Sequence, residues 1–279
     1  MPFADIGHVK INYHVIGKGE PLVLISGLGT DHKTWIFQIP YFKEYFKVIV
    51  FDNRGMGKST GSIGPYTTDL MADDTKKLIE HLKLEKVNVL GSSMGGMIAQ
   101  KLAIKHPELI DRLVLCSTSA KPGDNILEIL KEGLKGIVEN EEEYEEIFEE
   151  RPRLKIVRRT LGYFLTQVFS DEFIHDNKKL INDLVEEYVS NPRYYETFVK
   201  QVRAVHRHNT LQDLSKIKSE TLVLTGSDDS LLPDTSSDLI NKKIPNSKLV
   251  KMPGANHGVH YENSDEFNKI VLEFLKPKK

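Results

Sequence analysis

The stretch NVLGSSMGGMIAQ, residues 88–100, places two serines among glycines where an apolar run gives way to a helical pattern. The run before them has the composition of a buried strand, and GGMIAQKLAIKH after them is typical of a helix. Residues 91–95, GSSMG, fit the pattern G-x-S-x-G. Glycines permit the strained strand-to-helix turn that lifts the central residue above a sheet. The pattern therefore predicts that Ser93 presents its hydroxyl at this turn, whereas Ser92 points inward as a small packing residue.

Short apolar runs alternate with helical patterns along most of the chain. Nearly every residue in these runs is apolar, which is typical of strands buried on both faces, and strands alternating with helices indicate a parallel sheet. The predicted strands are PLVLISG (21–27), KVIVFD (47–52), KVNVLG (86–91), RLVLCS (112–117), ETLVLTG (220–226) and KLVKMPG (248–254). We predict an α/β fold with a mostly parallel central sheet and helices on both faces. An antiparallel hairpin, with arms near 9–11 and 13–15, is expected to lead into it.

One connection is far longer than the others. A hundred residues, 120–219, lie between Ser119, just after the fourth of these strands, and Glu220, which begins the fifth, whereas a parallel crossover needs only about a dozen. Apolar residues at 154–168 and 180–189 recur at steps of three and four, which predicts helices. The acidic run ENEEEYEEIFEE (139–150) has Tyr144, Ile147 and Phe148 at helical spacing and is interpreted as a solvated amphipathic helix. We expect this insertion to form a helical cap.

Composition limits the kinds of partner. The 279 residues are 39% hydrophobic and carry a formal net charge of −2, which suits a globular protein and argues against nucleic acid as the main partner. The single cysteine, Cys116, excludes an internal disulfide, and His206 and His208 have no acidic or cysteine neighbour that would make a metal site. No apolar run is long enough for a signal peptide or a membrane span. The expectation is a soluble cytoplasmic protein.

A nucleophilic Ser93 would need a base, because a serine hydroxyl is unreactive until a histidine oriented by a carboxylate takes its proton. After a G-x-S-x-G turn the acid comes next along the chain and the histidine follows it. Strand 220–226 is followed by two acids, and the segment 253–264, PGANHGVHYENS, holds two histidines. The residues by themselves leave two choices open: Asp228 or Asp229, and His257 or His260.

Two backbone amides are expected to complete the site. A reaction at Ser93 would create an oxyanion, which backbone N–H groups stabilise. One donor should be Met94, directly after the serine, and the other should come from the loop after the apolar run PLVLI (21–25). That loop, SGLGT (26–30), has two glycines that let an amide turn toward the site, and we predict Leu28 as the donor.

Over nearly its whole length the chain resembles the α/β-hydrolase superfamily, and within it the branch of carboxylesterases, enol-lactone hydrolases and carbon–carbon bond hydrolases. Five segments carry the resemblance: PLVLISGLGTDHKTW (21–35), VIVFDNRGMGKS (48–59), NVLGSSMGGMIAQ (88–100), TLVLTGSDDSLLP (221–233) and MPGANHGVHYENSDEFNKIVLEFL (252–275). One departure is in the oxyanion loop, where many members have His-Gly and this chain has Ser26-Gly27. Asp52 and Arg54 match a family motif that is mainly structural.

The resemblance selects among the open candidates. The family's acid stands three residues after the glycine that ends its strand, with a proline four residues further on, which matches Asp229 between Gly226 and Pro233. The family's histidine follows a Gly-x-x step, which matches His257 after Gly254. The resemblance thus implies a catalytic triad of Ser93, Asp229 and His257.

The implied activity is hydrolysis of small to medium carboxylic esters or lactones through an acyl-enzyme, without cofactor or metal. Two alternatives stay open: cleavage of a carbon–carbon or thioester bond by the same triad, and a hydrolase-fold ligand receptor with little turnover. The expected organisation is a core of residues 1–120 and 214–279 with a helical cap, residues 121–213. The expected partner is a small ester or lactone, with neither nucleic acid nor membrane, and the oligomeric state is left open.

Overall fold

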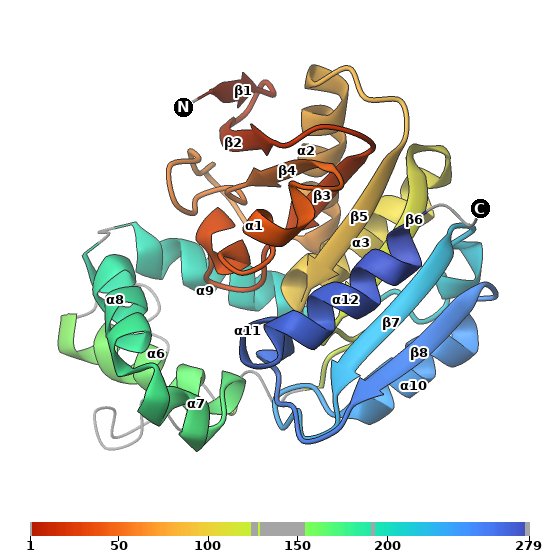
Figure 1. Cartoon of the computed structure of the whole chain (residues 1–279). Helices are drawn as coiled ribbons and strands as arrows, with labels where there is room; N and C mark the ends of the chain where they lie inside the picture. Colours follow the sequence, from red (N-terminus) through yellow and green to blue (C-terminus); the bar gives the residue numbers. More distant parts are fainter. Residues whose placement is uncertain (1, 124–127, 129–153, 191–192, 277–279) are drawn as a thin grey trace.

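The computed structural model describes residues 2–123, 128, 154–190 and 193–276 of the chain. An eight-stranded sheet runs through it in the order β1-β2-β4-β3-β5-β6-β7-β8 (Figure 1). The strands are β1 (Phe3–Asp5), β2 (Lys10–Ile16), β3 (Pro21–Ile25), β4 (Lys47–Phe51), β5 (Val87–Ser92), β6 (Ile110–Cys116), β7 (Glu220–Gly226) and β8 (Ser247–Met252). Neighbours from β4 to β8 pair in parallel, whereas β1 and β2 pair antiparallel at one edge. The predicted α/β fold is confirmed.

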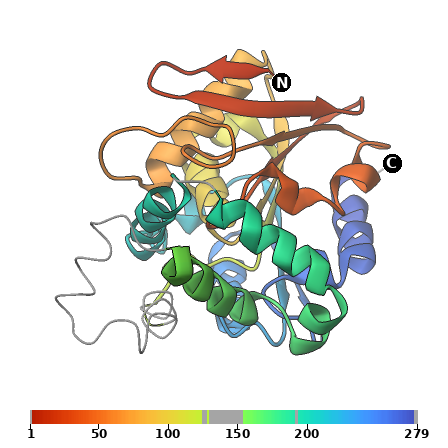
Figure 2. The ribbon, with the colours of Figure 1, turned by 90° about the vertical axis from the view of Figure 1, so that its left-hand side faces the viewer.

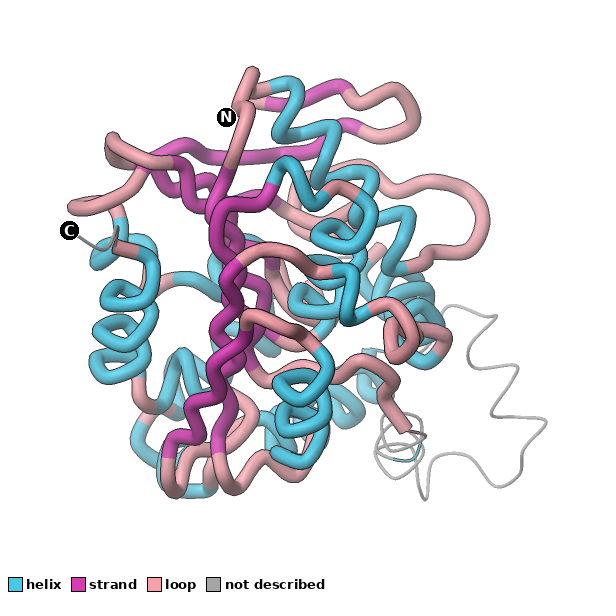
Figure 3. Tube along the Cα trace, turned by 90° about the vertical axis from the view of Figure 1, so that its right-hand side faces the viewer, coloured by secondary structure: helices cyan, strands magenta, loops and turns pink. Residues whose placement is uncertain are grey.

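Helices cover both faces of this sheet, which Figure 3 shows edge-on between two helical layers. One layer contains α2 (Thr68–His81), α3 (Met94–Lys105) and α10 (Asp234–Lys243). The other contains α1 (Ile39–Phe42), α11 (Val259–Glu262) and α12 (Ser264–Leu275). Short 3-10 helices are η1 (His32–Trp35), η2 (Pro107–Leu109) and η3 (Leu214–Lys216).

The strands supply both hydrophobic cores at once. In β3, Val23 and Ile25 belong to the core beneath α2 and α3, whereas Leu22 and Leu24 belong to the core beneath α12. Successive side chains of a strand point to opposite faces, so a strand between two cores must be apolar at nearly every position. This explains why the strands are recognisable as continuous apolar runs.

The long connection between β6 and β7 is helical in its described part. Its helices are α6 (Leu154–Val168), α7 (Asp171–Asp176), α8 (Lys178–Val189) and α9 (Tyr194–His206). Helices α6, α7 and α8 form a group beside the sheet rather than on one of its faces (Figure 1, Figure 2). The acidic run at 139–150 lies outside the described residues. The helices predicted at 154–168 and 180–189 are confirmed, and the division into core and cap stays a prediction.

The predicted arms of the N-terminal hairpin were wrong. Residues 10–11 and 13–15 lie in a single strand, β2, whose antiparallel partner is β1, and Val9 directly precedes that strand. The turn occurs earlier, where Gly7 has a φ of 97° and its N–H donates to Asp5 Oδ1 over 3.0 Å. The apolar residues of β2 dominate the sequence pattern, whereas β1 has only three residues and no comparable signal.

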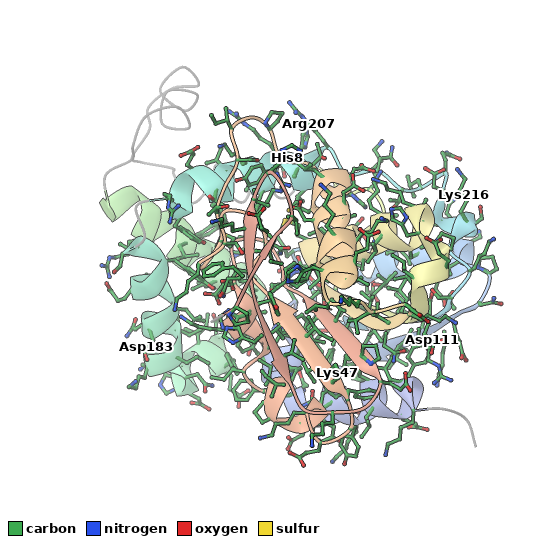
Figure 4. The ribbon with its side chains drawn as sticks, turned by 90° about the horizontal axis from the view of Figure 1, so that it is seen from above. His8, Lys47, Asp111, Asp183, Arg207 and Lys216 are labelled. Atoms are coloured by element: carbon green, nitrogen blue, oxygen red, sulfur yellow. The ribbon has the colours of Figure 1, made fainter. Side chains whose placement is uncertain are left out.

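Charged side chains of both signs project around the perimeter, as the labelled Lys47, Asp111 and Asp183 illustrate (Figure 4). Some of them pair: Lys86 Nζ lies 2.8 Å from Asp111 Oδ1, and Lys216 Nζ lies 2.7 Å from Asp213 Oδ1. Among the described residues, no helix has both the length and the apolar character needed to cross a bilayer.

Candidate active site

Ser93 occupies a strained turn between β5 and α3. Its φ of 55° and ψ of −120° are unfavourable for a residue with a side chain, and such strain costs about 1–3 kcal/mol and concentrates at functional sites. The turn is held by the Ser93 N–H, which donates to Cys116 O over 2.9 Å, and by Thr118 Oγ1, which donates to Ser93 O over 2.8 Å. A Cβ atom on Gly95 would overlap the carbonyl oxygen of Ile25, so the start of α3 can approach β3 only with glycine there.

Ser92 and Ser93 differ in their surroundings, although both border the same cavity. Ser92 is buried at the end of β5 and hydrogen-bonds the Cys116 thiol. Burial raises the pKa of that thiol to about 12, so Cys116 stays protonated and unreactive at neutral pH. Ser93 is more exposed than Ser92, and its side chain does not cap the helix that follows. The hydroxyl of Ser93 is therefore the better placed of the two for chemistry.

The structure brings Asp229 and His257 together. His257 Nδ1 lies 2.8 Å from Asp229 Oδ2, and both side chains are buried. The other carboxylate oxygen of Asp229 accepts hydrogen bonds from the N–H groups of Leu231 and Leu232, over 3.1 and 2.8 Å. A carboxylate held in this way can fix the tautomer of the imidazole and leave the far ring nitrogen free to take a proton.

The neighbouring candidates have different environments. Asp228 is exposed, and its carboxylate accepts from Ser227 Oγ over 2.7 Å. His260 is buried against Trp35 and Phe267, with ring centroids 5.2 and 6.1 Å away. Burial, and to a smaller extent the charge of His257, lowers the pKa of His260 to about 3. The geometry favours Asp229 over Asp228 and His257 over His260.

Ser93 and His257 border one cavity of about 70 Å³. The described residues show no direct hydrogen bond between their side chains, and such contacts often tighten only when substrate binds. Leu28 and Tyr261 also border the cavity, and the insertion contributes a further part of its lining. The lining residues from the insertion are Phe164, Leu165, Val168, Phe169, Leu184 and Tyr188. A larger hollow of about 710 Å³, at the opposite ends of β7 and β8, touches none of the predicted site residues.

The predicted oxyanion loop lies beside Ser93. A Cβ atom built on Gly27 would lie 3.4 Å from Ser93 Cβ. The loop is held by Asn53 Nδ2, which donates to Ser26 O over 3.0 Å, and by Thr30 Oγ1, which donates to Gly27 O over 3.2 Å.

The two predicted donors remain available. Within the described parts of the chain, neither the Leu28 nor the Met94 N–H donates a hydrogen bond to another protein group. The Met94 N–H belongs to the first turn of α3, where backbone N–H groups have no partner inside the helix. Both amides can therefore serve a developing negative charge.

One group of potential metal ligands lies close together in the described part of the chain: Asp31, His32 and Asp52. The oxygens of Asp52 are already used: Oδ1 accepts from the N–H and Nδ1 of His32, and Oδ2 accepts from Asn12 Nδ2 and the Lys58 N–H. Asp31 caps η1 by accepting from the Lys33 N–H over 2.8 Å. These contacts explain the group as part of the fold.

His206 and His208 do not form a metal pair either. His206 is exposed, whereas His208 is buried with Nδ1 2.9 Å from Thr68 Oγ1. Arg54, from the motif assigned a structural role, donates through Nη2 to Asp74 Oδ1 over 2.6 Å in a buried ion pair. The sequence interpretation missed a different residue, Gln201, which contacts the predicted oxyanion loop from α9. The pattern of apolar residues along an amphipathic helix does not reveal which of the neighbouring polar residues will be buried.

Comparison with known proteins agrees with this architecture. RutD of Serratia proteamaculans (strain 568), provisionally named a carbamate hydrolase, is 26% identical over 271 residues, covering 94% of this chain and 95% of that protein. 3-Oxoadipate enol-lactonase 2 of Acinetobacter baylyi is 26% identical over 270 residues, covering 96% and 94%. The crystal structure of the enol-lactonase from Burkholderia xenovorans LB400 superposes with a TM-score of 0.84 at 23% identity, covering 98% and 99%. Residues 20–264 match the family model of the alpha/beta hydrolase fold, and the chain belongs to this family.

Proposed function

We propose that this protein is a serine hydrolase that cleaves short, uncharged carboxylic esters or lactones. The observation that carries the proposal is the buried Asp229–His257 pair, whose histidine borders the same cavity as the strained Ser93. Backbone strain of this kind concentrates at functional residues, and a carboxylate-bound imidazole is the base that a serine nucleophile requires.

In the proposed reaction, His257 accepts the proton of Ser93 Oγ as that oxygen forms a bond to the substrate carbonyl carbon. The negative charge that develops on the carbonyl oxygen is held by the Leu28 and Met94 amides, each worth about 3 kcal/mol in such sites. The bond to the leaving alkoxide breaks as His257 returns the proton to it. Water then repeats the sequence on the acyl-enzyme and releases the acid and free Ser93. Protein groups fill every role, so we propose no cofactor.

The cavity supports a small, neutral acyl group. Its described lining is dominated by apolar and aromatic side chains and includes no lysine, arginine, aspartate or glutamate. A cavity of about 150 Å³ can hold benzene, so one of 70 Å³ suits an acyl chain of only a few carbons. A carboxylate on the substrate would lose its hydration without gaining a partner, which costs several kcal/mol.

The insertion is proposed to act as the substrate lid. Residues of α6 and α8 line the same cavity as Ser93, and ligand sites in α/β sheets lie outside the carboxyl ends of the strands. Enol-lactonase 2, at 26% identity, supports a lactone as one substrate class.

The test is a steady-state assay with 4-nitrophenyl esters from acetate to octanoate, using Ser93→Ala to subtract uncatalysed hydrolysis. We expect the highest kcat/KM for the short acyl chains. A length-matched comparison uses the neutral hexanoate ester against the half ester of adipic acid, which has the same number of acyl carbons and an added carboxylate. The value of kcat/KM should favour the neutral ester by at least about tenfold. Saturable ligand binding without turnover of any ester would replace the hydrolase proposal with the receptor alternative. Preference for the charged ester would overturn only the assignment of neutral substrates.

A further inference from the structure

A buried side chain of α9 reaches the predicted oxyanion loop. Gln201 is fully buried, and its Oε1 accepts a hydrogen bond from the Gly29 N–H over 2.9 Å. The two residues are 172 positions apart in the chain, so this contact joins the insertion to the loop that follows β3. Among the described residues, Gln201 Oε1 is the only acceptor for a hydrogen bond from the Gly29 N–H.

The contact belongs to a fitted surface. Tyr194, Phe198 and Gln201 follow one another at steps of four and three on α9, so they share one face of the helix. Gly29 has a φ of 68°, and a Cβ atom on it would lie 2.8 Å from both Phe198 Cδ2 and Tyr194 Oη. Helix α9 is thus packed directly on the loop, and the Gln201 amide is directed by that packing.

The hydrogen bond between Gly29 and Gln201 also restrains Leu28, the residue directly before Gly29. A peptide group is planar, so the Leu28 N–H is oriented together with the Gly27 carbonyl, which accepts from Thr30 Oγ1 over 3.2 Å. The next peptide group contains the Gly29 N–H, which Gln201 holds. Leu28 therefore lies between two restrained peptide planes, and only its own φ and ψ connect them.

We infer that Gln201 is a positioning residue that sets the direction of the Leu28 N–H toward the oxyanion. This inference rests on the proposed serine-hydrolase function. It assigns the insertion a part in the chemical step, since one of its helices holds the donor loop in place. Gln201 does not border the cavity, so it acts through the loop rather than on the substrate.

A purely structural glutamine would affect folding without affecting the transition state. Gln100 provides a matched control: it is also fully buried, its Nε2 donates to Ser119 O over 3.2 Å, and its Oε1 accepts from Thr210 Oγ1 over 2.6 Å. The same substitution, Gln→Met, removes the polar group at either site with little change of shape. Any difference between the two variants beyond stability then reports on the oxyanion loop.

The experiment measures kcat and KM for a short neutral ester, and the affinity for a trifluoromethyl ketone and its unfluorinated methyl ketone. The fluorinated ketone adds to Ser93 Oγ and places an oxyanion in the donor site. For Gln201→Met we expect kcat to fall about 10- to 100-fold with KM within about threefold, because a misdirected donor loses part of the 10²–10³-fold effect of deleting one. Affinity for the fluorinated ketone should fall by a similar factor, whereas affinity for the methyl ketone should stay within about threefold. Gln100→Met should lower the thermal midpoint and keep kcat and both affinities near the parent values.

Unchanged kcat and unchanged fluorinated-ketone affinity in folded Gln201→Met would overturn the inference, and so would equal losses in the two glutamine variants. Gln201→Asn keeps the amide but shortens it by one methylene, so it carries the same expectation if the methionine variant does not fold. A parent protein without ester turnover, or one whose turnover survives Ser93→Ala, would instead refute the proposed function.

Discussion

Gly226 at the end of β7 touches the loop that precedes His257 so closely that a Cβ atom on it would overlap the carbonyl oxygen of Ala255. The same carbonyl accepts a hydrogen bond from the Asp228 N–H over 2.9 Å. These contacts join the loop after β7, which carries Asp229, to the loop after β8, which carries His257. The Asp229–His257 hydrogen bond therefore depends on a glycine at 226.

Gly226→Ala tests that dependence. The added methyl group must push the two loops apart, and overpacking of this kind typically costs about 1–3 kcal/mol of stability. We expect folded variant protein to lose more than tenfold in kcat/KM for a short ester. Gly162→Ala is the control, because a Cβ atom there meets nothing within 4 Å. Parent-like kcat/KM in folded Gly226→Ala would show that the loops can shift without disturbing the pair.

Replacing Ser92 and Ser93 in turn by alanine tests which of the two serines is the nucleophile. Ser93→Ala should lower ester turnover at least about a thousandfold, because a nucleophile, base and acid act as a unit. Ser92→Ala should keep most of the activity, since Ser92 is buried and its hydroxyl hydrogen-bonds the Cys116 thiol. The measurement is kcat for one short ester. An inactive Ser92→Ala beside an active Ser93→Ala would place the nucleophile one residue earlier.

Asp229→Asn should reduce turnover by orders of magnitude, since an amide cannot hold His257 in the tautomer that accepts a proton. Asp228→Asn should have a much smaller effect because that carboxylate is exposed and bonds Ser227. Steady-state kinetics of the two variants, with circular dichroism to verify folding, show which of the two carboxylates supports His257. Equal losses in two folded variants would remove the distinction between the two acids.

If the insertion is the substrate lid, shortening its side chains that line the cavity should change the substrate preference. Phe164→Ala and Tyr188→Ala enlarge the cavity from the insertion side, so the preferred acyl length should increase while the Ser93-dependent chemistry remains. Tyr163→Ala is the matched control, because Tyr163 is exposed on the same helix and does not border the cavity. Specificity constants across the 4-nitrophenyl ester series provide the readout. Unchanged length profiles in Phe164→Ala and Tyr188→Ala would show that the insertion is no lid.

Stability should decrease on acidification because of two buried histidines. Burial lowers the pKa of His208, and that of His260, to about 3, whereas an unfolded histidine titrates near 6.5. Between these values the unfolded chain binds more protons, so the stabilisation present above pH 6.5 is lost progressively toward pH 3. Each group should cost about 2 kcal/mol between pH 7 and pH 5.

Urea unfolding at pH 7 and pH 5 measures this loss. His208→Gln should lose about 2 kcal/mol less than the parent on acidification, whereas His175→Gln should behave like the parent because His175 is exposed. The same pH dependence in parent and His208→Gln would mean that His208 is not the titrating group.

Much of the fold was predictable because its signals are local. Strands buried between two cores must be apolar throughout, and β3 to β7 were found for that reason. The Ser93 turn was also predictable, because Gly95 at the start of α3 has to approach β3. β1 was missed, since a three-residue edge strand has no periodicity to detect.

The acid and the histidine needed more than residue patterns. Two acids follow β7 and two histidines follow β8, and only the family resemblance separated them in the sequence. In the structure, Asp229 meets His257 because the two loops pack on each other, whereas Asp228 points to solvent and His260 into the core.

The sequence by itself determined the order of strands and helices, the turn that presents Ser93 and the short sets of candidate partners. Tertiary structure alone decided which side chains of the insertion line the cavity that Ser93 borders and which contact the predicted oxyanion loop. Gln201 has no sequence signal, because its contact with Gly29 spans 172 residues and depends on how α9 packs on the core. A helical stripe specifies which residues are buried, but the surface they are buried against is set by packing between distant segments.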